Sequence, residues 1–218
     1  MEEESDMPKV TEAYKQEKRK MIVNTAWEIL EQKPLYELNM LEVLKKAGLS
    51  KGGIYLYFSD IDELLIETIN TIFSSYEELS FSVDVQKEDV ETGLLKIFHE
   101  LGDYMEACPA IIEKIRFELQ VYMTNHPEKM ETMLPHIKLQ QSGAVFMTLV
   151  SELIQKGIGQ NLFRKGLEMD VILTNIMVYV DGMTEYVTRM KAYHGPKLKY
   201  SVSTYFEQFI RSQMREWR

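Results

Sequence analysis

One short stretch, AGLSKGGIYLYF at residues 47 to 58, combines a lysine, closely spaced glycines and three aromatic side chains. Its Lys51, together with the backbone amides next to Ser50, could meet phosphate groups, because the start of a helix attracts anions. Two glycines follow, Gly52 and Gly53, and they would let the start of the helix approach a large partner closely. The stretch therefore has the features of a helix that touches a phosphate-bearing molecule.

The aromatic end of the stretch divides into an inner and an outer face. Ile54 and Phe58 are four residues apart and share an inward face, whereas Tyr55 lies between two faces and Leu56 and Tyr57 look outward. Tyrosine hydroxyls can reach phosphate oxygens, and a leucine can touch the methyl group of thymine. These features favour a DNA contact. The alternative is a pair of helices whose aromatic residues simply fill a core.

Three short helices are predicted to position this stretch, at residues 12 to 32, 39 to 46 and 50 to 57. The turn between the second and third contains Gly48, which suits a positive φ angle, and Ser50 can cap the third helix. Two short helices joined by a tight turn after a longer supporting helix form a helix-turn-helix.

The rest of the chain also has helical spacing of apolar residues, with no sustained alternation of the kind that marks strands. The sequence predicts an all-α fold of about nine helices. We expect an N-terminal tail and helix-turn-helix domain over residues 1–59 and a second helical domain over residues 60–218. The first residues, MEEESDM, are strongly acidic and are expected to be disordered.

Charge is distributed unevenly along the chain, whose net charge is -9. Residues 8–57 carry nine Lys or Arg against six Glu, a net charge of +3, while residues 58–218 carry -8. Affinity for nucleic acid comes largely from Lys and Arg. The asymmetry permits a DNA contact at the N-terminal end and disfavours one elsewhere.

Other classes of protein find little support in the sequence. The single cysteine, Cys108, excludes an intramolecular disulfide and a thiolate metal cage. The four histidines show no metal-ligand spacing, and no Ser-His-acid or Cys-His group is localised enough to predict catalysis. No apolar run reaches eighteen residues, and the N-terminus lacks the pattern of a signal peptide. We expect a cytoplasmic protein that is not an enzyme, with no metal and no cofactor.

The run MLEVLKKAGLSKGGIYLYFSDIDELL at residues 40–65 resembles the DNA-binding domain of the TetR/AcrR family of bacterial transcription regulators. Residues 18–30 resemble the first helix of that family, and residues 153–183 are similar to its weaker C-terminal signature. The resemblance implies a ligand-responsive regulator, most often a repressor, that binds a palindromic operator as a homodimer. The residues that it and the helix geometry assign to DNA are Asn39, Lys45, Lys46, Ser50, Lys51, Gly52, Gly53, Tyr55, Leu56 and Tyr57.

Four positions depart from the family pattern. Leu38 and Asn39 stand where threonines are usual, and Leu44 stands where a small alanine is usual within the second helix. Ile61 stands where a lysine usually contacts the DNA backbone. Asn39 can still cap the second helix. Basic residues between Lys15 and Lys20, or Lys45 and Lys46, are candidates to replace the missing contact.

The resemblance also implies that the second domain binds a small molecule and dimerises. The segments 167–192 and 197–218 are rich in large apolar residues, and the short HGP sequence between them predicts an antiparallel pair that would dimerise as a four-helix interface. Candidate pocket residues are Phe98, Leu101, Tyr104, Met105, Ile115, Glu118, Tyr122, Phe146 and Met147. The alternative function is an all-helical small-molecule binding protein or enzyme in which the first helices are only structural.

Overall fold

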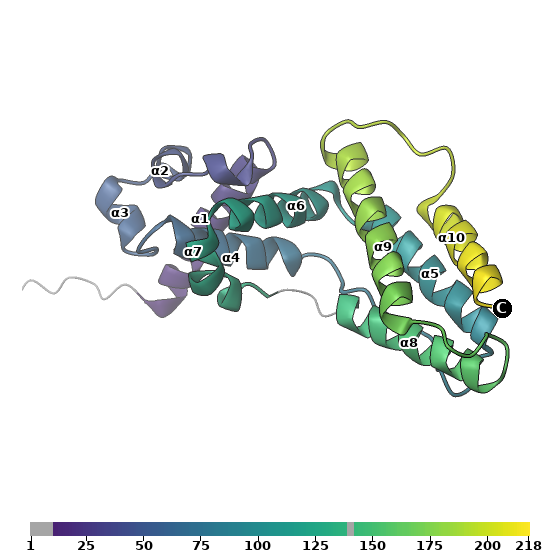
Figure 1. The fold of residues 1–218 in the computed structure, drawn as a ribbon. Coiled ribbons are helices and arrows are strands. Elements are labelled where there is room, and N and C mark those ends of the chain that lie inside the picture. The colour runs from purple at the N-terminus through teal and green to yellow at the C-terminus, as the bar shows by residue number, and fades with distance from the viewer. Residues whose placement is uncertain (1–10, 139–141) are drawn as a thin grey trace, which may run out of the picture. The chain divides into compact units, whose positions relative to one another are not determined.

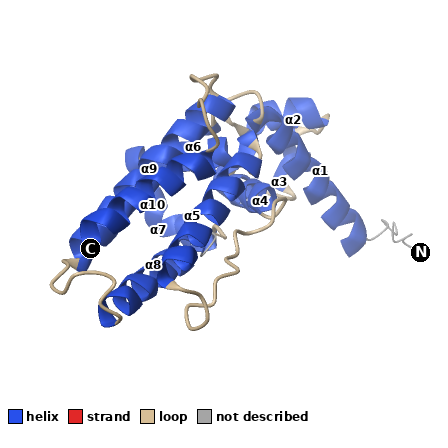
Figure 2. Ribbon diagram, turned by 90° about the vertical axis from the view of Figure 1, so that its right-hand side faces the viewer, coloured by secondary structure: helices blue, strands red, loops and turns tan. Residues whose placement is uncertain are grey.

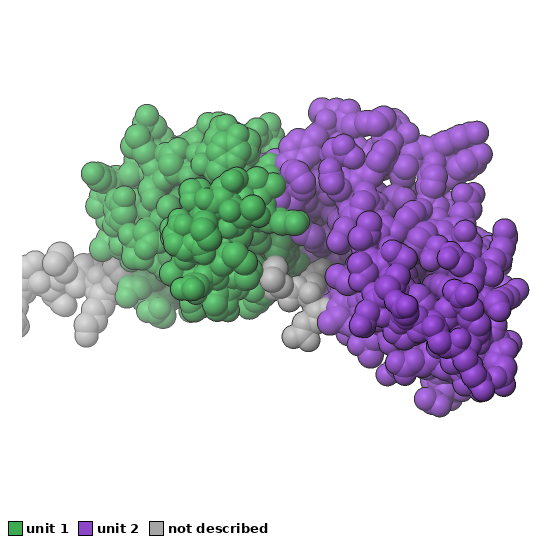
Figure 3. All heavy atoms as spheres, in the orientation of Figure 1, with its two compact units in different colours: residues 1–75, 118–138 green, residues 76–117, 139–218 purple. Residues whose placement is uncertain are grey.

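The structure, a computed structural model, describes residues 11–138 and 142–218, which form ten α-helices and two 3-10 helices without a strand (Figure 1, Figure 2). The predicted all-α class is confirmed, with ten helices where about nine were expected. Two compact units make up the chain (Figure 3): residues 1–75 with 118–138, and residues 76–117 with 139–218. The acidic tail predicted to be disordered lies outside the described residues.

The first unit contains the predicted helix-turn-helix and extends well beyond residue 59. Its buried apolar residues recur at helical spacing, with Ile22, Ala26 and Ile29 on α1 and Leu65 and Ile69 on α4. These two faces hold α1 against α4. The elements of the unit are α1 (Glu12–Leu30), a 3-10 turn (Leu35–Glu37), α2 (Met40–Ala47), α3 (Lys51–Tyr55), α4 (Ile61–Phe73), residues 118–125 of α6 (Ala110–Asn125), α7 (Pro127–Thr132) and a 3-10 turn (Leu134–His136).

The start of α4 follows a modified form of the capping box. Asp60 caps the helix by accepting from the amide of Glu63 at 2.9 Å. The carboxylate of Glu63 reaches back to the amide of Ser59 at 2.8 Å, one residue earlier than in the standard box. Both bonds keep the loop between α3 and α4 close to the first turn of α4.

The second unit is built around an aromatic cluster on α5. Phe98 is fully buried, and its ring centroid lies 5.3 Å from that of Phe146 and 5.8 Å from that of Phe206. Such aromatic contacts stabilise a core beyond the burial of their area. The helices of the unit are α5 (Val90–Ala107), residues 110–117 of α6, α8 (Ser142–Gly159), α9 (Met169–Ala192) and α10 (Val202–Trp217).

The predicted tight connection before the last helix is wrong. Helix α10 begins at Val202, so nine residues separate it from α9, and Ser201 caps it by accepting from the amide of Thr204 at 3.1 Å. Helix α10 packs chiefly on α5. It meets α9 mainly through Tyr179, whose ring is stacked on Phe209 with centroids 3.9 Å apart.

Candidate nucleic-acid interface

Helices α2 and α3 are joined by a three-residue turn, as predicted. Gly48 ends α2 with a φ angle of 67°, a left-handed conformation that favours glycine. Asn39 caps α2 by accepting from the amide of Glu42 at 3.0 Å, and Ser50 caps α3 by accepting from the amide of Gly53 at 3.1 Å. The turn thus depends on a glycine that adopts a left-handed conformation, and each cap depends on a side-chain oxygen that accepts a hydrogen bond from a nearby amide.

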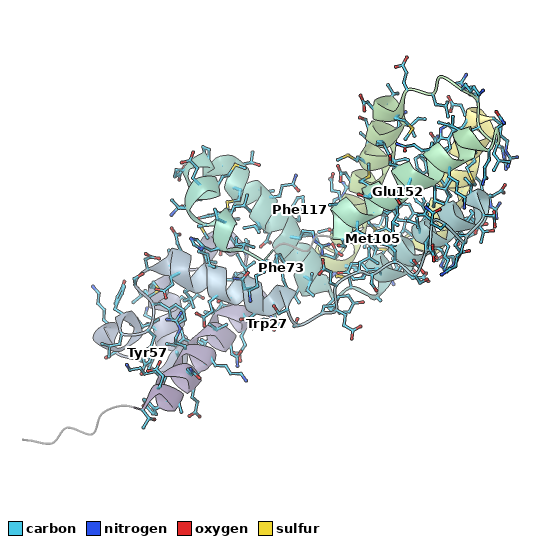
Figure 4. The ribbon with its side chains drawn as sticks, turned by 90° about the horizontal axis from the view of Figure 1, so that it is seen from below. Trp27, Tyr57, Phe73, Met105, Phe117 and Glu152 are labelled. Atoms are coloured by element: carbon cyan, nitrogen blue, oxygen red, sulfur yellow. The ribbon has the colours of Figure 1, made fainter. Side chains whose placement is uncertain are left out.

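Helix α3 has the two faces that its sequence predicts. Ile54 and Phe58 are fully buried, whereas Leu56 is 80% exposed and Tyr55 is 47% exposed. Tyr57, labelled in Figure 4, was predicted to look outward but is half-buried. The interpretation in which all the aromatic residues fill a core is therefore wrong for Tyr55, and Leu56 lies entirely on the surface.

The lysines predicted to contact phosphate are all exposed. Lys46 lies 3.1 Å from Glu28, but both side chains are more than 40% exposed, so this pair is weak and can open. For Lys45 and Lys51, the described part of the chain holds no ion pair. These lysines are therefore accessible to a phosphate.

Gly52 and Gly53 differ in what surrounds them. A Cβ atom added to Gly53 would lie 3.1 Å from the capping hydroxyl of Ser50, so glycine there protects the cap. A Cβ atom added to Gly52 would meet nothing within 4 Å. No contact among the described residues requires a glycine at position 52, which is consistent with a close approach by an outside partner.

The departures at Leu38 and Ile61 have different structural consequences. Leu38 is 6% exposed and belongs to the core, so an apolar residue there adds to packing. Ile61 is half-buried at the first position of α4 and brings no positive charge. Among the proposed substitutes for the missing lysine, Arg19 is already engaged within the protein.

Sequence reasoning missed the contacts of Arg19. Its guanidinium donates to the backbone carbonyl of Tyr57, to Glu63 and to Glu67, and it lies 4.1 Å from the centre of the Phe58 ring. These partners are 38 to 48 residues away in sequence, so no local pattern indicates them.

Two exposed side chains near the start of α2 were also missed. Tyr36 is 69% exposed and Leu41 is 59% exposed. Together with Tyr55 and Leu56, these side chains form a group of large exposed apolar residues around α2 and α3. The sequence alone does not show this group, because it does not give the exposure of each side chain.

The predicted pocket residues fall into two groups. Phe98, Leu101, Met105, Phe146 and Met147 belong to one packed cluster in the second unit. Ile115 is buried and Tyr104 is half-buried in the same unit, whereas Glu118 and Tyr122 belong to the first unit.

Glu118 has a structural contact of its own. Its side chain is 8% exposed and accepts a hydrogen bond from the amide of Leu35 at 2.8 Å. A buried carboxylate needs such a partner. Glu118 thus ties α6 to the 3-10 turn that precedes α2.

An open cleft of about 970 Å³ lies in the first unit, between α1, α4 and residues 132–138. None of the predicted pocket residues lines it. Its lining includes Asp62, which is paired with Lys129, and Glu63 and Glu67, which are paired with Arg19. Since these carboxylates already have cationic partners, the cleft does not by itself indicate a cationic ligand.

The described residues contain no group of three His, Cys, Asp or Glu side chains that could hold a metal ion. Two histidines have a carboxylate partner that the sequence did not indicate: His99 Nδ1 lies 3.0 Å from Asp103 Oδ2, and His126 Nδ1 lies 3.3 Å from Glu128 Oε1. All four side chains are more than 40% exposed. In the part of the chain that is described, no helix combines the length and apolar character needed to cross a membrane.

Comparisons with known proteins agree with the geometry of the first unit. Residues 22–68, which run from α1 to α4, match the family model described as bacterial regulatory proteins, tetR family. The HTH-type transcriptional regulator YfiR of Bacillus subtilis, itself uncharacterized, is 25% identical over 82% of this chain and 83% of its own length. The regulator HbdR of Aromatoleum sp. strain CIB is 31% identical over 33% of this chain and 29% of its own length.

Solved structures share the fold at low sequence identity. The repressor MexZ of Pseudomonas aeruginosa has a TM-score of 0.60 and 14% identity, over 93% of this chain and 96% of its own. A TetR transcription regulator of Haloarcula marismortui has a TM-score of 0.54 and 12% identity, over 93% of this chain and 98% of its own. The helix-turn-helix, the matched residues and the shared fold agree: residues 22–68 form a DNA-binding domain of the tetR family of bacterial regulatory proteins, and the chain shares the fold of a TetR transcription regulator.

Proposed function

We propose that the protein is a repressor that binds a palindromic operator as a homodimer through α3 and is released by a small-molecule effector. The observation that carries the proposal is the capped helix α3, which buries Ile54 and turns Leu56 and Tyr55 outward on the same short element as the exposed Lys51. Exposed apolar and aromatic side chains next to a free cation suit a surface that a nucleic acid covers.

The contacts divide by chemistry. Lysines and helix caps are suited to phosphate oxygens, and the outward aromatic and apolar groups are suited to sugars and base edges. The proposed phosphate contacts are Asn39, Lys45, Lys46, Ser50 and Lys51, and the proposed sugar and base contacts are Gly52, Gly53, Tyr55, Leu56 and Tyr57.

Dimerisation is supported by an exposed apolar face on α9. Val171 is 51% exposed, Met177 is 50% exposed and Val178 is 66% exposed. A second copy of the chain would cover these side chains and set two α3 helices at the spacing of two operator half-sites. Light scattering on the purified protein should give the mass of two chains, about twice 25.6 kDa.

Release by an effector requires two conformations with different operator affinities. A ligand that prefers the weakly binding conformation shifts the population toward it, by a coupling free energy of about 1 to 3 kcal/mol. We propose that the effector binds among the middle helices of the second unit, near Phe98, Leu101, Met105, Phe146 and Met147, which belong to one packed apolar cluster. Its two methionine side chains can adapt their shape to a ligand.

The operator experiment tests the function directly. A gel shift with the DNA upstream of its own gene, against a random duplex and across a salt series, should show at least about 1000-fold tighter binding to the specific site. The proposal would be contradicted if the protein bound both duplexes equally and if selection from a random pool of duplexes yielded no preferred sequence. That result would favour the alternative, a small-molecule binding protein without a DNA partner.

Replacing Tyr57 with alanine should weaken operator binding about tenfold, because one side-chain contact to DNA is typically worth about 1 to 3 kcal/mol. The backbone carbonyl that Arg19 uses is kept, so the melting temperature should fall only by the packing that the half-buried ring of Tyr57 provides. The matched control is Tyr200→Ala, at a 50% exposed tyrosine in the second unit. Unchanged affinity with an unchanged salt slope would remove Tyr57 from the contact surface.

Replacing Gly52 with alanine should separate stability from DNA binding. The new methyl group meets no atom of the described residues within 4 Å, and alanine favours a helix over glycine by up to about 1 kcal/mol. The fold should therefore be equally or slightly more stable. Operator affinity should nevertheless fall about tenfold, because the methyl group keeps the helix from the duplex. Gly159→Ala, also with open space around its Cβ, is the control and should leave affinity unchanged.

A further inference from the structure

Arg19 on α1 joins three parts of the first unit. Nη1 donates to the carbonyl of Tyr57 just after α3, and both terminal nitrogens lie 3.1 Å from Glu63 Oε1 on α4. Nη2 also donates to Glu67, and the guanidinium lies over the Phe58 ring at 4.1 Å. A planar guanidinium with several donors can serve all these partners at once, which a lysine ammonium cannot do in the same geometry.

The charge around Arg19 argues against a phosphate contact. Glu63 and Glu67 bring two negative charges to one guanidinium, so the group as a whole is negative. Although partial burial disfavours the charged form, the hydrogen bonds to Glu67 and Glu63 raise the pKa of Arg19 above its ordinary value. A phosphate approaching Arg19 would meet two carboxylates, so the cation is committed within the protein.

We call the contacts of Arg19 with Tyr57, Glu63 and Glu67 the clamp, and the clamp acts at the end of α3. Helix α3 has only five residues, and so short a helix is not stable by itself. Ser50 fixes its start, and beyond its end the amides of Tyr57 and Phe58 both donate to the carbonyl of Ile54, at 3.0 and 3.1 Å. The carbonyls at the end of a helix need outside donors, and Arg19 supplies one at Tyr57.

The clamp continues from Arg19 into the loop that starts α4. The second oxygen of Glu63 accepts from the amide of Ser59 at 2.8 Å and from the hydroxyl of Ser59 at 3.0 Å. Arg19, Glu63 and Ser59 therefore form one connected network. Loss of Arg19 would release both the carbonyl of Tyr57 and the carboxylate that holds the loop.

We propose that Arg19 is a positioning residue for DNA recognition: it fixes the end of α3 against α1 and α4, and so sets the direction of Tyr55, Leu56 and Tyr57, without touching the DNA itself. This inference rests on the proposed function for its DNA readout.

The test uses Arg19→Lys, which keeps the charge but loses the planar group with several donors. Operator affinity, on the duplex found by the gel shift, should fall about tenfold with the salt slope of the wild type. Lys51→Gln provides the comparison, because loss of a phosphate contact should lower the slope by about 0.9. Arg189→Lys is the matched control at an exposed arginine paired with Glu185 at 3.6 Å, and it should not change affinity.

A second measurement needs no DNA. Hydrogen exchange at the amides of Tyr57, Phe58 and Ser59 should become faster in Arg19→Lys, while exchange in the second unit stays unchanged. Glu67→Gln removes one anchor of the guanidinium and should produce a smaller effect of the same kind. It also provides a test if Arg19→Lys does not fold.

The outcomes distinguish the two proposals. If the wild type binds no specific DNA, the proposed function fails, while the exchange data still decide whether the clamp orders the end of α3. A salt slope reduced by about 0.9 in Arg19→Lys would show that Arg19 contacts phosphate and would overturn the inference. Faster exchange without a loss of operator affinity would overturn it too, as would wild-type behaviour in both measurements.

Discussion

Replacing Gly102 with alanine is expected to destabilise the second unit by about 3 kcal/mol, the range typical of inserting an atom into a close-packed site. Gly102 lies on α5, where a Cβ atom would lie 2.5 Å from Cα and 2.6 Å from the amide nitrogen of Ser203 on α10. These are backbone atoms, so no side chain can rotate away and the two helices must separate. Separation would loosen the cluster around Phe98 and Phe206, whose rings are 5.8 Å apart.

Urea unfolding of the variant and the wild type measures this effect. Gly143→Ala is the matched control, since it lies on a helix of the same unit and its Cβ would meet nothing within 4 Å. The control should be as stable as the wild type, or up to about 1 kcal/mol more stable. Equal unfolding midpoints for Gly102→Ala and the wild type would show that α5 and α10 are not in such close contact.

Replacing Leu56 with glutamate is expected to give the largest loss of operator binding, about 100-fold or more. Leu56 is 80% exposed at the end of α3, so the substitution removes no core contact and the fold should be retained. At a DNA surface the carboxylate would face a dense row of phosphate charges and would leave any thymine methyl without its apolar partner. A loss of 100-fold corresponds to about 2.7 kcal/mol.

A titration of the operator duplex at fixed salt measures the loss, with circular dichroism to verify the fold. The control is Leu162→Glu, which adds the same charge at a 50% exposed leucine in the second unit. The control changes the net charge equally, so any difference reports the position of the charge. If the two variants bind the operator equally well, α3 is not the recognition helix.

The local structure of the DNA-binding unit could be predicted because its causes lie within a few residues. Asn39, Ser50 and Asp60 each cap a helix by accepting from an amide three residues ahead. The inward faces at Ile54 and Phe58 follow from spacing by four. At the start of α4, Glu63 accepts from the amide of Ser59, one residue before the amide of Asp60 that a standard capping box would use.

The end of α9 and the start of α10 show where local reasoning fails. The sequence suggested a short turn, but Ser201 provides a cap and delays the helix to Val202. A local sequence pattern also does not indicate that α10 packs on α5. Helix α10 packs on α5 at Gly102 because a missing side chain there lets two backbones approach, and a sequence does not show which helix fills that space.

The helical class, the helix-turn-helix and the exposure of Leu56 beside the buried Ile54 and Phe58 follow from the sequence, since propensity, capping and periodicity act over a few residues. Long-range packing, in contrast, places Arg19 at the end of α3, the carboxylate of Glu118 at the amide of Leu35, and α10 on α5. These contacts join residues 38 to 101 positions apart. They depend on how whole helices pack against one another, and no periodic pattern of residues in the sequence indicates which helices will meet.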